Sequence, residues 1–424
     1  MTNTYGTLQS LRYSASSMLP PPPPWSHRLF TAGVTGTNGK TTTTSYLASA
    51  LGCLHGPVLR ITTVGSFLGQ EKIDVADDYD GFVEAMKRAL DVGAKMAVLE
   101  CTSEALAVGF AKAWPISIGV FTNLTRDHLD SHGSAEHYLA SKAQLFVHLP
   151  PGGAAVLNAY DPASALLAEV IPKSVRTLRY GLSSRSSGPP VMDVDIAAER
   201  VIVGWDGTRV KLWPSSRLAG FDREMHLRAI GEVYAENALA ALAAAMEAGI
   251  SANDAVDAIE KTPAIPGRFE VIGAGPRAVV DYGHSPDALE RTLATARSLC
   301  AGRLIVVFGA GGERDRGKRE AMGRAARIAD RIVLTSDNPR REDPALIAAA
   351  IRRGVGDHPA VSVVLDREKA IFDALGGADV DDVVVIAGRG PETEQVFASG
   401  ARRLVDAEVA RRALGELVRL DKHA

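Results

Sequence analysis

The residues best suited to chemistry stand in Gly36-Thr-Asn-Gly-Lys-Thr-Thr42, directly after the apolar run Leu29–Val34. A strand that leads into a glycine turn, followed by lysine and hydroxyl residues at the start of a helix, is typical of phosphate-binding loops. Gly36 and Gly39 allow backbone N–H groups to approach phosphate oxygens, and Lys40 can reach the terminal phosphates. The stretch therefore predicts an ATP site.

The hydroxyl groups of this stretch suit a metal ion. Thr41 or Thr42 can place an oxygen on Mg²⁺ beside the phosphates. The spacing differs from the strict Walker pattern, because Val34 stands five positions before Gly39 where that pattern has glycine. The alternative interpretation is an ordinary glycine turn with a nearby lysine. We expect ATP, Mg²⁺ and nucleotide contacts from the whole stretch, which comprises Gly36, Thr37, Asn38, Gly39, Lys40, Thr41 and Thr42.

Further metal ligands are expected at the ends of neighbouring strands, because open parallel sheets bind their ligands at the carboxyl ends. Glu100 ends the expected strand Met96–Leu99. The next expected strand, Ile116–Phe121, runs into a loop with three candidate ligands or bases, Asp127, His128 and Asp130. The competing interpretations are a solvated acid at a strand end for Glu100 and a hydrogen-bonded structural histidine for His128.

Lys142 follows in the helical stretch His137–Phe146. An ammonium group has three donors and no acceptor, so it cannot ligate Mg²⁺. The physical chemistry of the residue alone favours a surface lysine.

Composition excludes several classes of protein. The 424 residues are enough for two or three domains, and 46% hydrophobic and 23% charged residues are ordinary for a globular chain. A formal net charge of −3 gives no electrostatic reason to expect nucleic acid. The three cysteines are far apart, which suggests neither a disulfide framework nor a cysteine zinc site. We find no membrane-spanning run and no signal peptide, and we expect a cytoplasmic protein.

Alternating strand and helix patterns predict an α/β fold built on a mostly parallel sheet. We expect an extended or disordered leader over residues 1–27, which contains the stiff run Pro20–Pro24, and then a central ATP-binding domain over residues 28–265. Within this domain, residues 175–227 read as antiparallel strands joined by turns such as Trp205-Asp-Gly-Thr208, which indicates a small β-subdomain.

The prolines and glycine of Pro263-Ala-Ile-Pro-Gly-Arg268 indicate a domain junction. After it, residues 266–424 are expected to form a second, Rossmann-like α/β domain. Its stretch Phe308-Gly-Ala-Gly-Gly-Glu313 is a poor nicotinamide fingerprint, because Arg314 stands where the third glycine is required.

Seven motifs, taken together and in order over about residues 30–415, resemble the Mur ligase family. The subgroup that adds the third residue of the peptidoglycan peptide is the most similar. The motifs are Gly36–Thr42, Thr122-Asn-Leu-Thr-Arg-Asp-His-Leu-Asp130, Glu136-His-Tyr-Leu-Ala-Ser-Lys142, Pro266-Gly-Arg268, Asp281-Tyr-Gly-His-Ser-Pro-Asp287, Phe308-Gly-Ala-Gly-Gly-Glu-Arg-Asp315 and Asp337-Asn-Pro-Arg340.

The resemblance implies an ATP-dependent amide ligase. A donor carboxylate would attack the γ-phosphate to form an acyl phosphate, and an amino acid's amine would then displace phosphate. Thr41 and Glu100 would hold one Mg²⁺, and His128 would belong to a second. Lys142 would be carbamylated, which converts the cation into an anionic ligand. The residues implied to face the nucleotide, besides the glycine stretch, are Asn123, Asn237, Arg268 and Asp281.

The Asp337–Arg340 motif resembles the family version that reads meso-diaminopimelate, with arginine forked onto a carboxylate. Taken alone, the motif is equally well read as a turn with a surface arginine. The implied amino-acid-binding residues are Arg314, Asp337, Asn338, Arg340, Gly388 and Glu392.

Three departures from the family pattern concern the donor. Only some thirty residues precede the glycine stretch, so a UDP-binding domain is expected to be missing. The muramoyl-binding Thr-Thr-Pro segment is replaced by Val75-Ala-Asp-Asp-Tyr79, and a histidine by Glu104 in Glu100-Cys-Thr-Ser-Glu104. The third departure, to which the Glu104 change belongs, also includes Gly388-Arg-Gly-Pro-Glu392, where the family usually has Gly-Lys-Gly-His-Glu.

We therefore expect a ligase whose partners are an amino acid and a small carboxylate other than UDP-MurNAc-dipeptide, with no nucleic acid and no membrane. One alternative is the usual muramoyl donor with a truncated N-terminus. Another, of a different class, is a catalytically weak ATP-binding scaffold. The retained Lys40, Glu100, His128 and Lys142 argue against the scaffold.

Overall fold

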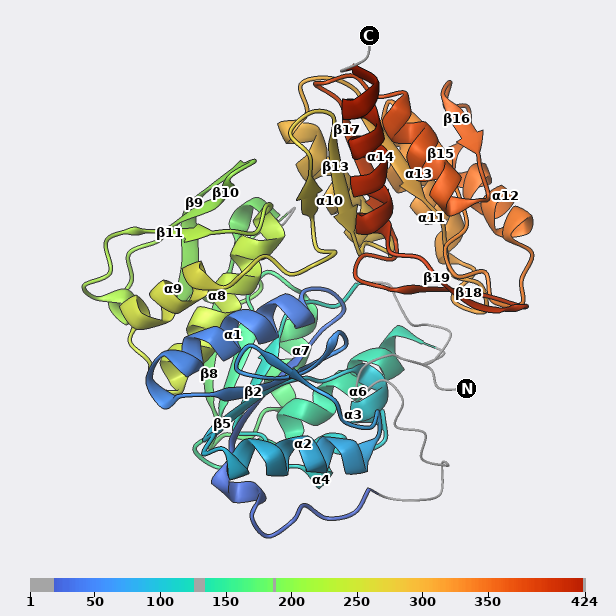
Figure 1. The fold of residues 1–424 in the computed structure, drawn as a ribbon. Helices are drawn as coiled ribbons and strands as arrows, with labels where there is room; N and C mark the ends of the chain where they lie inside the picture. Colours follow the sequence, from blue (N-terminus) through green and yellow to red (C-terminus); the bar gives the residue numbers. More distant parts are fainter. Residues whose placement is uncertain (1–18, 126–133, 186–187, 422–424) are drawn as a thin grey trace.

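The computed structural model describes residues 19–125, 134–185 and 188–421. Within these residues the chain forms two α/β units, which Figure 1 shows side by side. We call them the large unit (residues 30–261) and the small unit (residues 270–421). Each unit is built on its own sheet, eleven-stranded in the large unit and six-stranded in the small one.

The large sheet is parallel at its centre and antiparallel at both edges. Its strands lie in the order β11-β10-β9-β8-β7-β6-β1-β5-β2-β3-β4. Their bounds are β1 (Phe30–Thr35), β2 (Val58–Thr62), β3 (Gly65–Leu68), β4 (Glu71–Ile73), β5 (Met96–Glu100), β6 (Ile118–Phe121), β7 (Ala154–Asn158), β8 (Arg176–Gly181), β9 (Ile196–Gly204), β10 (Gly207–Leu212) and β11 (Glu224–Leu227).

The prediction of antiparallel strands in this region is correct for the pair β9 and β10 and wrong for β8, and β11 was not predicted. Strand β8 pairs in parallel with β7, and β9 also runs parallel to β8. The reason is the helix α7 (Ala163–Val170), which carries the chain back across the sheet between β7 and β8. The separate β-subdomain is therefore the continuation of the main sheet.

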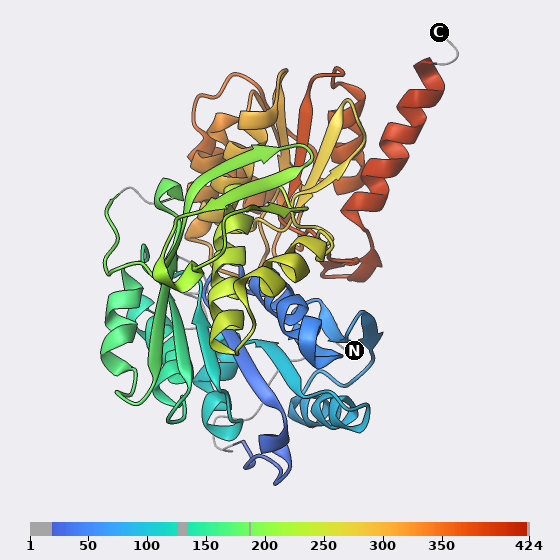
Figure 2. The same cartoon turned by 90° about the vertical axis from the view of Figure 1, so that its left-hand side faces the viewer.

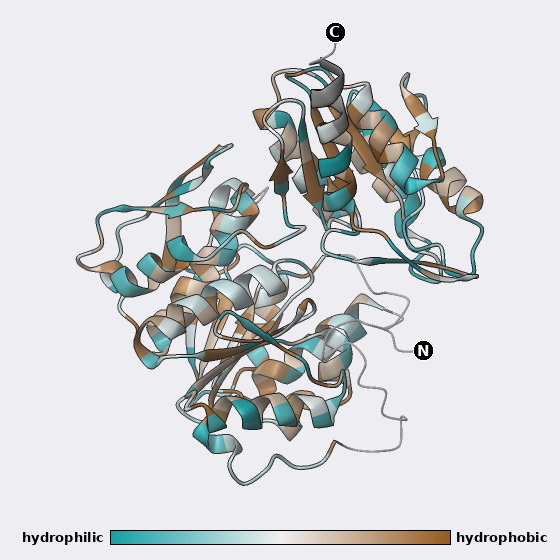
Figure 3. Cartoon of the chain, in the orientation of Figure 1, coloured by the Kyte–Doolittle hydropathy of each residue, from teal (hydrophilic) through white to brown (hydrophobic). Residues whose placement is uncertain are grey.

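Helices cover both faces of the large sheet, as the alternation along its strands requires. In β5, Met96 and Val98 belong to one hydrophobic cluster, while Ala97 and Leu99 belong to the other. Figure 3 shows the strands as brown bands inside paler helices. One face carries α1 (Lys40–His55), α8 (Glu232–Glu247) and α9 (Ala252–Lys261), and the other carries α2 (Tyr79–Asp91), α3 (Ser103–Ala107), α4 (Phe110–Ala113), α6 (Ala135–Val147) and α7.

The small sheet has the order β12-β13-β17-β14-β15-β16, and it is parallel except for β12. Its strands are β12 (Glu270–Ile272), β13 (Arg277–Asp281), β14 (Leu304–Phe308), β15 (Arg331–Leu334), β16 (Val361–Val363) and β17 (Val383–Ala387). The helices are α10 (Pro286–Leu299), α11 (Lys318–Ala325), α12 (Pro344–Val355), α13 (Arg367–Gly376) and α14 (Asp406–Asp421), and a hairpin is formed by β18 (Glu394–Phe397) and β19 (Gly400–Arg403).

The segment before β1 lies against the large unit. Trp25 meets Trp114 edge-on with ring centroids 6.0 Å apart, and the Tyr79 hydroxyl donates to the Pro20 carbonyl at 3.3 Å. Among the described residues, we find no helix with the length and apolar character needed to cross a bilayer.

Candidate active site

The stretch that joins β1 to the first residues of α1 (residues 36–42, which we call the glycine loop) has a shape that only glycine permits at two positions. Gly36 has φ 146° and Gly39 has φ 85°. A Cβ at Gly36 would lie 1.9 Å from Thr122 Oγ1, and one at Gly39 would lie 2.3 Å from Asn237 Oδ1. The loop is therefore packed on both sides by polar side chains.

Neighbouring strands hold the loop in this shape. The Asn38 backbone N–H donates to Asn123 Oδ1 at 2.9 Å, and Thr122 Oγ1 donates to the Asn38 carbonyl at 2.7 Å. The Lys40 ammonium folds over the loop and donates to the carbonyls of Thr37 at 2.8 Å and Gly36 at 3.2 Å. Asn123, expected at the nucleotide, thus braces the loop directly.

Three hydroxyl or carboxylate groups meet at the start of α1. Glu100 Oε2 accepts from Thr41 Oγ1 at 2.8 Å and from the Thr63 backbone N–H at 3.1 Å. Glu100 is 3% exposed at the end of β5, so the interpretation as a solvated acid is wrong. Thr63 was not expected here, although it follows β2 at the same edge of the sheet and the strand-end rule reaches it.

These groups suit Mg²⁺, which prefers hard oxygen ligands and keeps several waters and phosphate oxygens in its shell. Among the described residues there is no cluster of three or more His, Cys, Asp or Glu side chains. The candidates Asp127, His128 and Asp130 lie outside the described residues. The Thr41 hydroxyl and the Glu100 carboxylate therefore fit a Mg²⁺ ion at the start of α1.

Lys142 is buried beneath the glycine loop. Its side chain leaves α6 and donates from Nζ to the Gly36 carbonyl at 2.8 Å, and the residue is 1% exposed. Its ammonium lies 4.1 Å from the ring centroid of Tyr138, whose hydroxyl donates to Thr37 Oγ1 at 3.3 Å. The interpretation of Lys142 as a surface residue is therefore wrong, because α6 packs its inner face against the loop.

The segment between the two units contributes an arginine to the same corner. Arg268 Nη2 donates to Thr41 Oγ1 at 3.3 Å, and its guanidinium lies 4.4 Å from the ring centroid of Tyr282. Arg268 Nε is buried and finds no hydrogen-bond partner among the described residues. A half-buried guanidinium with an unpartnered Nε favours an anion beside it, and a phosphate oxygen would supply one.

Asp281 supports the segment that carries Arg268. Its two carboxylate oxygens accept from the backbone N–H groups of Phe269 at 2.9 Å and Gly283 at 2.8 Å. The Thr292 hydroxyl also donates to Asp281 at 2.8 Å. Asp281 thus shapes the turn that follows Arg268.

A cavity of about 590 Å³ lies between the two units, and we call it the interface cavity. At one end the Asn38 side chain donates to Asp287 Oδ2 at 3.2 Å, which joins the glycine loop to α10. Apolar residues, including Val203, Ile230 and Ala294, line other parts of its wall. The predicted nucleotide residues that line it are Asn38, Gly39, Thr41, Thr42, Asn237, Arg268 and Asp281.

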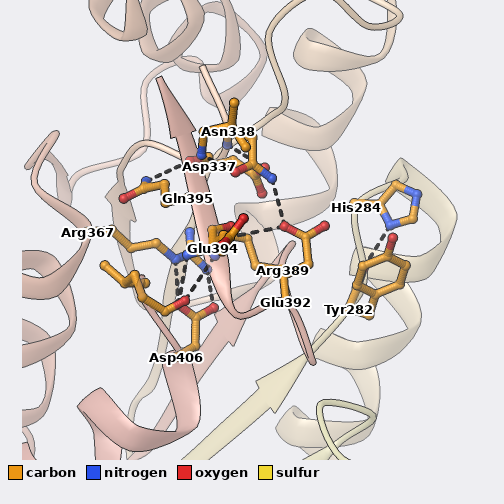
Figure 4. A network of polar contacts seen from close by, with 12 residues as sticks. Tyr282, His284, Asp337, Asn338, Arg367, Arg389, Glu392, Glu394, Gln395 and Asp406 are labelled. Atoms are coloured by element: carbon orange, nitrogen blue, oxygen red, sulfur yellow. Dashed lines mark hydrogen bonds and ion pairs between the residues drawn. The ribbon is translucent and has the colours of Figure 1, made fainter. Parts of the chain in front are cut away.

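A second group of predicted residues meets in the small unit, and Figure 4 shows part of it. The Asn338 side chain donates to Glu392 Oε2 at 2.7 Å and accepts from the Val396 backbone at 2.9 Å. Burial, and then the neighbouring charge of Asp337, raise the pKa of Glu392 above its ordinary value. Gly388 is needed because a Cβ there would lie 2.7 Å from Asp337 Oδ2. We call Asp337, Asn338, Arg340, Gly388 and Glu392 the C-terminal cluster.

The arginines of this region approach Gly311 and Gly312. Arg340 adopts φ 53° and donates from Nη1 to the Gly312 carbonyl at 2.7 Å. A Cβ at Gly311 would lie 3.2 Å from Arg340 Nη1 and 3.5 Å from Arg314 Cγ, so the two side chains flank the same loop. Sequence reasoning missed a buried pair in the same unit, Arg367 and Asp406, whose charged atoms lie 2.7 Å apart.

The C-terminal cluster and the interface cavity are neighbours. A Cβ at Gly267 would lie 2.3 Å from the Gly390 backbone, so the loop that carries Glu392 packs against the segment that carries Arg268. The structure thus brings the predicted residues into two adjacent groups, with a cavity at the first.

Comparisons with known proteins agree with this geometry. The family model of the Mur ligase middle domain matches residues 34–245, and that of the Mur ligase, glutamate ligase domain matches residues 267–390. The chain is 37% identical over 400 residues to a UDP-N-acetylmuramoyl-L-alanyl-D-glutamate–2,6-diaminopimelate ligase of Thermosynechococcus vestitus, covering 92% of this chain and 78% of that protein. The ligase of the same name from Bacillus licheniformis is 37% identical, with 91% and 78% covered.

Solved structures show the same relation. A structure of a UDP-N-acetylmuramoyl-L-alanyl-D-glutamate–2,6-diaminopimelate ligase is 32% identical with a TM-score of 0.61, over 92% of this chain and 79% of that one. At 17% identity, the folylpolyglutamate synthase of Mycobacterium tuberculosis shares the fold, with a TM-score of 0.67 over 86% and 89% of the two chains. The chain therefore belongs to the Mur ligase family and is an ATP-dependent ligase that forms amide bonds.

Proposed function

We propose that the interface cavity binds ATP and that the glycine loop holds its phosphates. One observation carries the proposal: Thr41 contacts Glu100 in the large unit and Arg268 in the segment between the units. A metal-binding hydroxyl and a half-buried guanidinium that meet at a glycine loop favour the transfer of a phosphoryl group. We also propose that the two domains divide between residues 265 and 266.

The proposed reaction joins a carboxylate donor to an amino acid through an acyl phosphate, with release of ADP and phosphate. Bound Mg²⁺, held by Thr41 and Glu100, would neutralise charge on the phosphates. Lys40 would turn from the loop carbonyls to the terminal phosphates, and Arg268 would stabilise the charge that develops on the transferred group. Because Arg268 belongs to the segment between the units, this contact requires that the units stay closed.

We propose that Lys142 acts as a carbamate. Reaction of its amine with CO₂ would replace the cation with an anionic group that can approach a metal ion, whereas the ammonium can only donate. Its burial and its place beneath Gly36 support this role. Replacement by alanine should abolish phosphate release, and formate or acetate should restore part of it. Activity of Lys142→Ala without any added acid would contradict the carbamate.

The C-terminal cluster is the proposed site of the amino acid. Arg340 and Arg314 offer guanidinium groups for a carboxylate, and the carboxylates of Glu392 and Asp337 offer partners for an ammonium group. This arrangement suits an amino acid whose far end carries both charges. The relatives act on 2,6-diaminopimelate by their names, and we propose the meso form of this amino acid as the first substrate to try.

We propose a carboxylate donor other than UDP-MurNAc-dipeptide. The support is local: the segment 75–79 carries Asp77 and Asp78, and Glu104 replaces the family's histidine. Asp78 is committed to capping α2, since its side chain accepts from the Gly81 N–H at 2.8 Å. The second candidate donor is UDP-MurNAc-L-Ala-D-Glu, and the identity of 37% over 400 residues with a ligase named for this substrate favours it.

One experiment tests the function and separates the donors. Phosphate release is measured for a panel of carboxylates, each with and without an amino acid, and the panel includes UDP-MurNAc-L-Ala-D-Glu and meso-diaminopimelate. Ligation requires release that depends on both substrates, so release that ignores the amine would contradict it. Saturable binding of the UDP-linked dipeptide in calorimetry would overturn the unusual donor and favour the second candidate.

A further inference from the structure

The tip of the β9–β10 hairpin touches the small unit, at a point far along the chain from the glycine loop. Trp205 stands in this turn, and its indole Nε1–H donates to the Leu299 carbonyl at 3.2 Å. The guanidinium of Arg277, on β13, lies 4.7 Å from the centroid of the Trp205 ring. Figure 2 shows the hairpin reaching across to the small unit. The contact is thus a polar and aromatic bridge between the two units.

This bridge satisfies groups that each unit leaves without a partner of its own. Helix α10 ends at Leu299, and the last carbonyls of a helix accept no hydrogen bond from within the helix. A half-buried indole N–H needs an acceptor, which the Leu299 carbonyl supplies. Arg277 adds a positive charge beside the negative end of the helix dipole. The hairpin therefore caps the C-terminus of α10.

Helix α10 is fastened to the large unit at both ends. Near its start, Asp287 accepts from the Asn38 side chain of the glycine loop, and its end accepts from Trp205. The 14 residues of α10 span about 21 Å. Between the two attachments, α10 and the hairpin both line the interface cavity, since Val203 of β9 and Ser298 of α10 belong to its wall.

We propose that Trp205 is a positioning residue that fastens the far end of α10 and so sets the width of the interface cavity away from the glycine loop. The proposal rests on the proposed function, because it takes this cavity to be the nucleotide site. Loss of the bridge frees the end of α10 that lies beyond the phosphates. It should therefore weaken nucleotide binding more than it slows phosphoryl transfer.

The test is ADP binding measured by calorimetry on the full chain. Trp205→Ala should weaken the Kd of ADP about tenfold, the loss expected for one hydrogen bond together with a cation–π contact. The matched control is Trp213→Ala, which removes the same side chain from the residue after β10, where it is 59% exposed. The control should bind ADP like the wild type.

Kinetics separate positioning from a general loss of structure. Trp205→Ala should raise the KM for ATP about tenfold and leave kcat within about twofold, because the groups at Thr41 are untouched. Trp205→Phe keeps a ring beside Arg277 and loses the N–H, so it should raise the KM for ATP only about threefold. If the alanine variant does not fold, the phenylalanine variant carries the test.

The outcomes are distinct. Equal ADP affinity in the wild type, Trp205→Ala and Trp205→Phe would overturn the positioning role while leaving the nucleotide site intact. A wild type that binds no ADP would instead overturn the nucleotide assignment, and the proposal would fall with it. Weakening by Trp205→Phe and Trp205→Ala but not by Trp213→Ala would support it.

Discussion

The glycine loop and the C-terminal cluster achieve their order by different physical means. The glycine loop is held through its backbone, which bonds to the Asn123 and Thr122 side chains and to two lysine ammonium groups, with glycines where side chains would collide. The C-terminal cluster instead brings together two carboxylates, Asp337 and Glu392, and the charge of one raises the pKa of the other. The oppositely charged pair Arg367 and Asp406 is buried near them. The first region is therefore pre-formed for an anion, whereas the second depends on ionisation.

This difference predicts where catalysis and where folding are most sensitive. Loss of the Arg268 charge near the glycine loop should remove activity and spare stability, since the Arg268 side chain bonds to the Thr41 hydroxyl and not to the backbone of the loop. Loss of a charge buried near the C-terminal cluster should instead reduce stability and have the smaller effect on activity. The predictions below test this contrast.

The largest effect is expected for Arg268→Ala. The only described side-chain hydrogen bond of this guanidinium is its contact with Thr41, so kcat should fall about a thousandfold, as for other arginines that stabilise a transferred phosphoryl group. Phosphate release measures the loss. The control is Arg209→Ala, at an exposed position of β10, which should keep full activity. A change in unfolding free energy that matches the loss of activity would break the comparison.

Asp406→Ala should produce the largest loss of stability. It leaves the Arg367 guanidinium buried and without its carboxylate, which costs about 3–5 kcal/mol in comparable pairs. Urea unfolding followed by circular dichroism measures the change. Asp373→Ala removes a carboxylate from an exposed pair with Lys369, and its effect should stay below about 1 kcal/mol. Equal effects of the two variants would contradict the role given to burial.

Arg340→Lys should weaken the amino acid and spare the nucleotide. Lysine keeps the charge and loses the planar fork, so the KM for the amino acid should rise about ten- to a hundredfold. The Kd of ADP should stay unchanged, because the C-terminal cluster lies outside the interface cavity wall. Initial rates at varied amino-acid concentration provide the measurement. Parallel loss of ADP binding would show that the two regions are not separable.

The smallest effect concerns pH. The pKa of Glu392 is raised from 4.5 by burial and by Asp337, so the unfolded chain loses this proton at a lower pH than the folded one. The folded state therefore loses stability as the pH rises from about 4.5 through the folded pKa, and the full loss is present above it. Glu392→Gln should be more stable than the wild type at neutral and alkaline pH.

The difference between Glu392→Gln and the wild type should vanish below the ordinary pKa of glutamate, where both side chains are neutral. Urea unfolding between pH 4 and pH 9 tests this. A difference that does not depend on pH would show that the amide acts through packing and not through charge.

Much of the fold could be predicted from local patterns. The expected strands Met96–Leu99 and Ile116–Phe121 agree with β5 and β6 to within two residues, because continuous apolar runs buried on both faces mark such strands clearly. The weak edge strands β3 and β4 were not predicted, since they are short and mostly half-exposed or exposed. The direction of β8 was predicted wrongly, because a strand's own residues do not record which neighbour it pairs with.

The site residues also fall into those that local patterns predicted and those that depend on how the elements pack. The glycine loop and Glu100 were predicted from spacing, because a phosphate cradle needs consecutive residues and a strand end. Lys142 was assigned to the site only through the family resemblance, and its burial under Gly36 depends on how α6 packs. Thr63, which follows β2, and Asp287, in the second unit, were not assigned to the site, because their contacts with Glu100 and Asn38 depend on how separate elements pack.

The sequence by itself determined the alternation of strands and helices, the glycine loop and the family motifs, since each is a matter of residue type at short spacing. Only the tertiary structure decided which carboxylates are buried together, that Arg268 meets Thr41, and that Trp205 fastens α10. The contacts of Arg268 with Thr41 and of Trp205 with Leu299 join residues 227 and 94 positions apart. Their existence depends on burial and on the closure of two units, which no short stretch of sequence records.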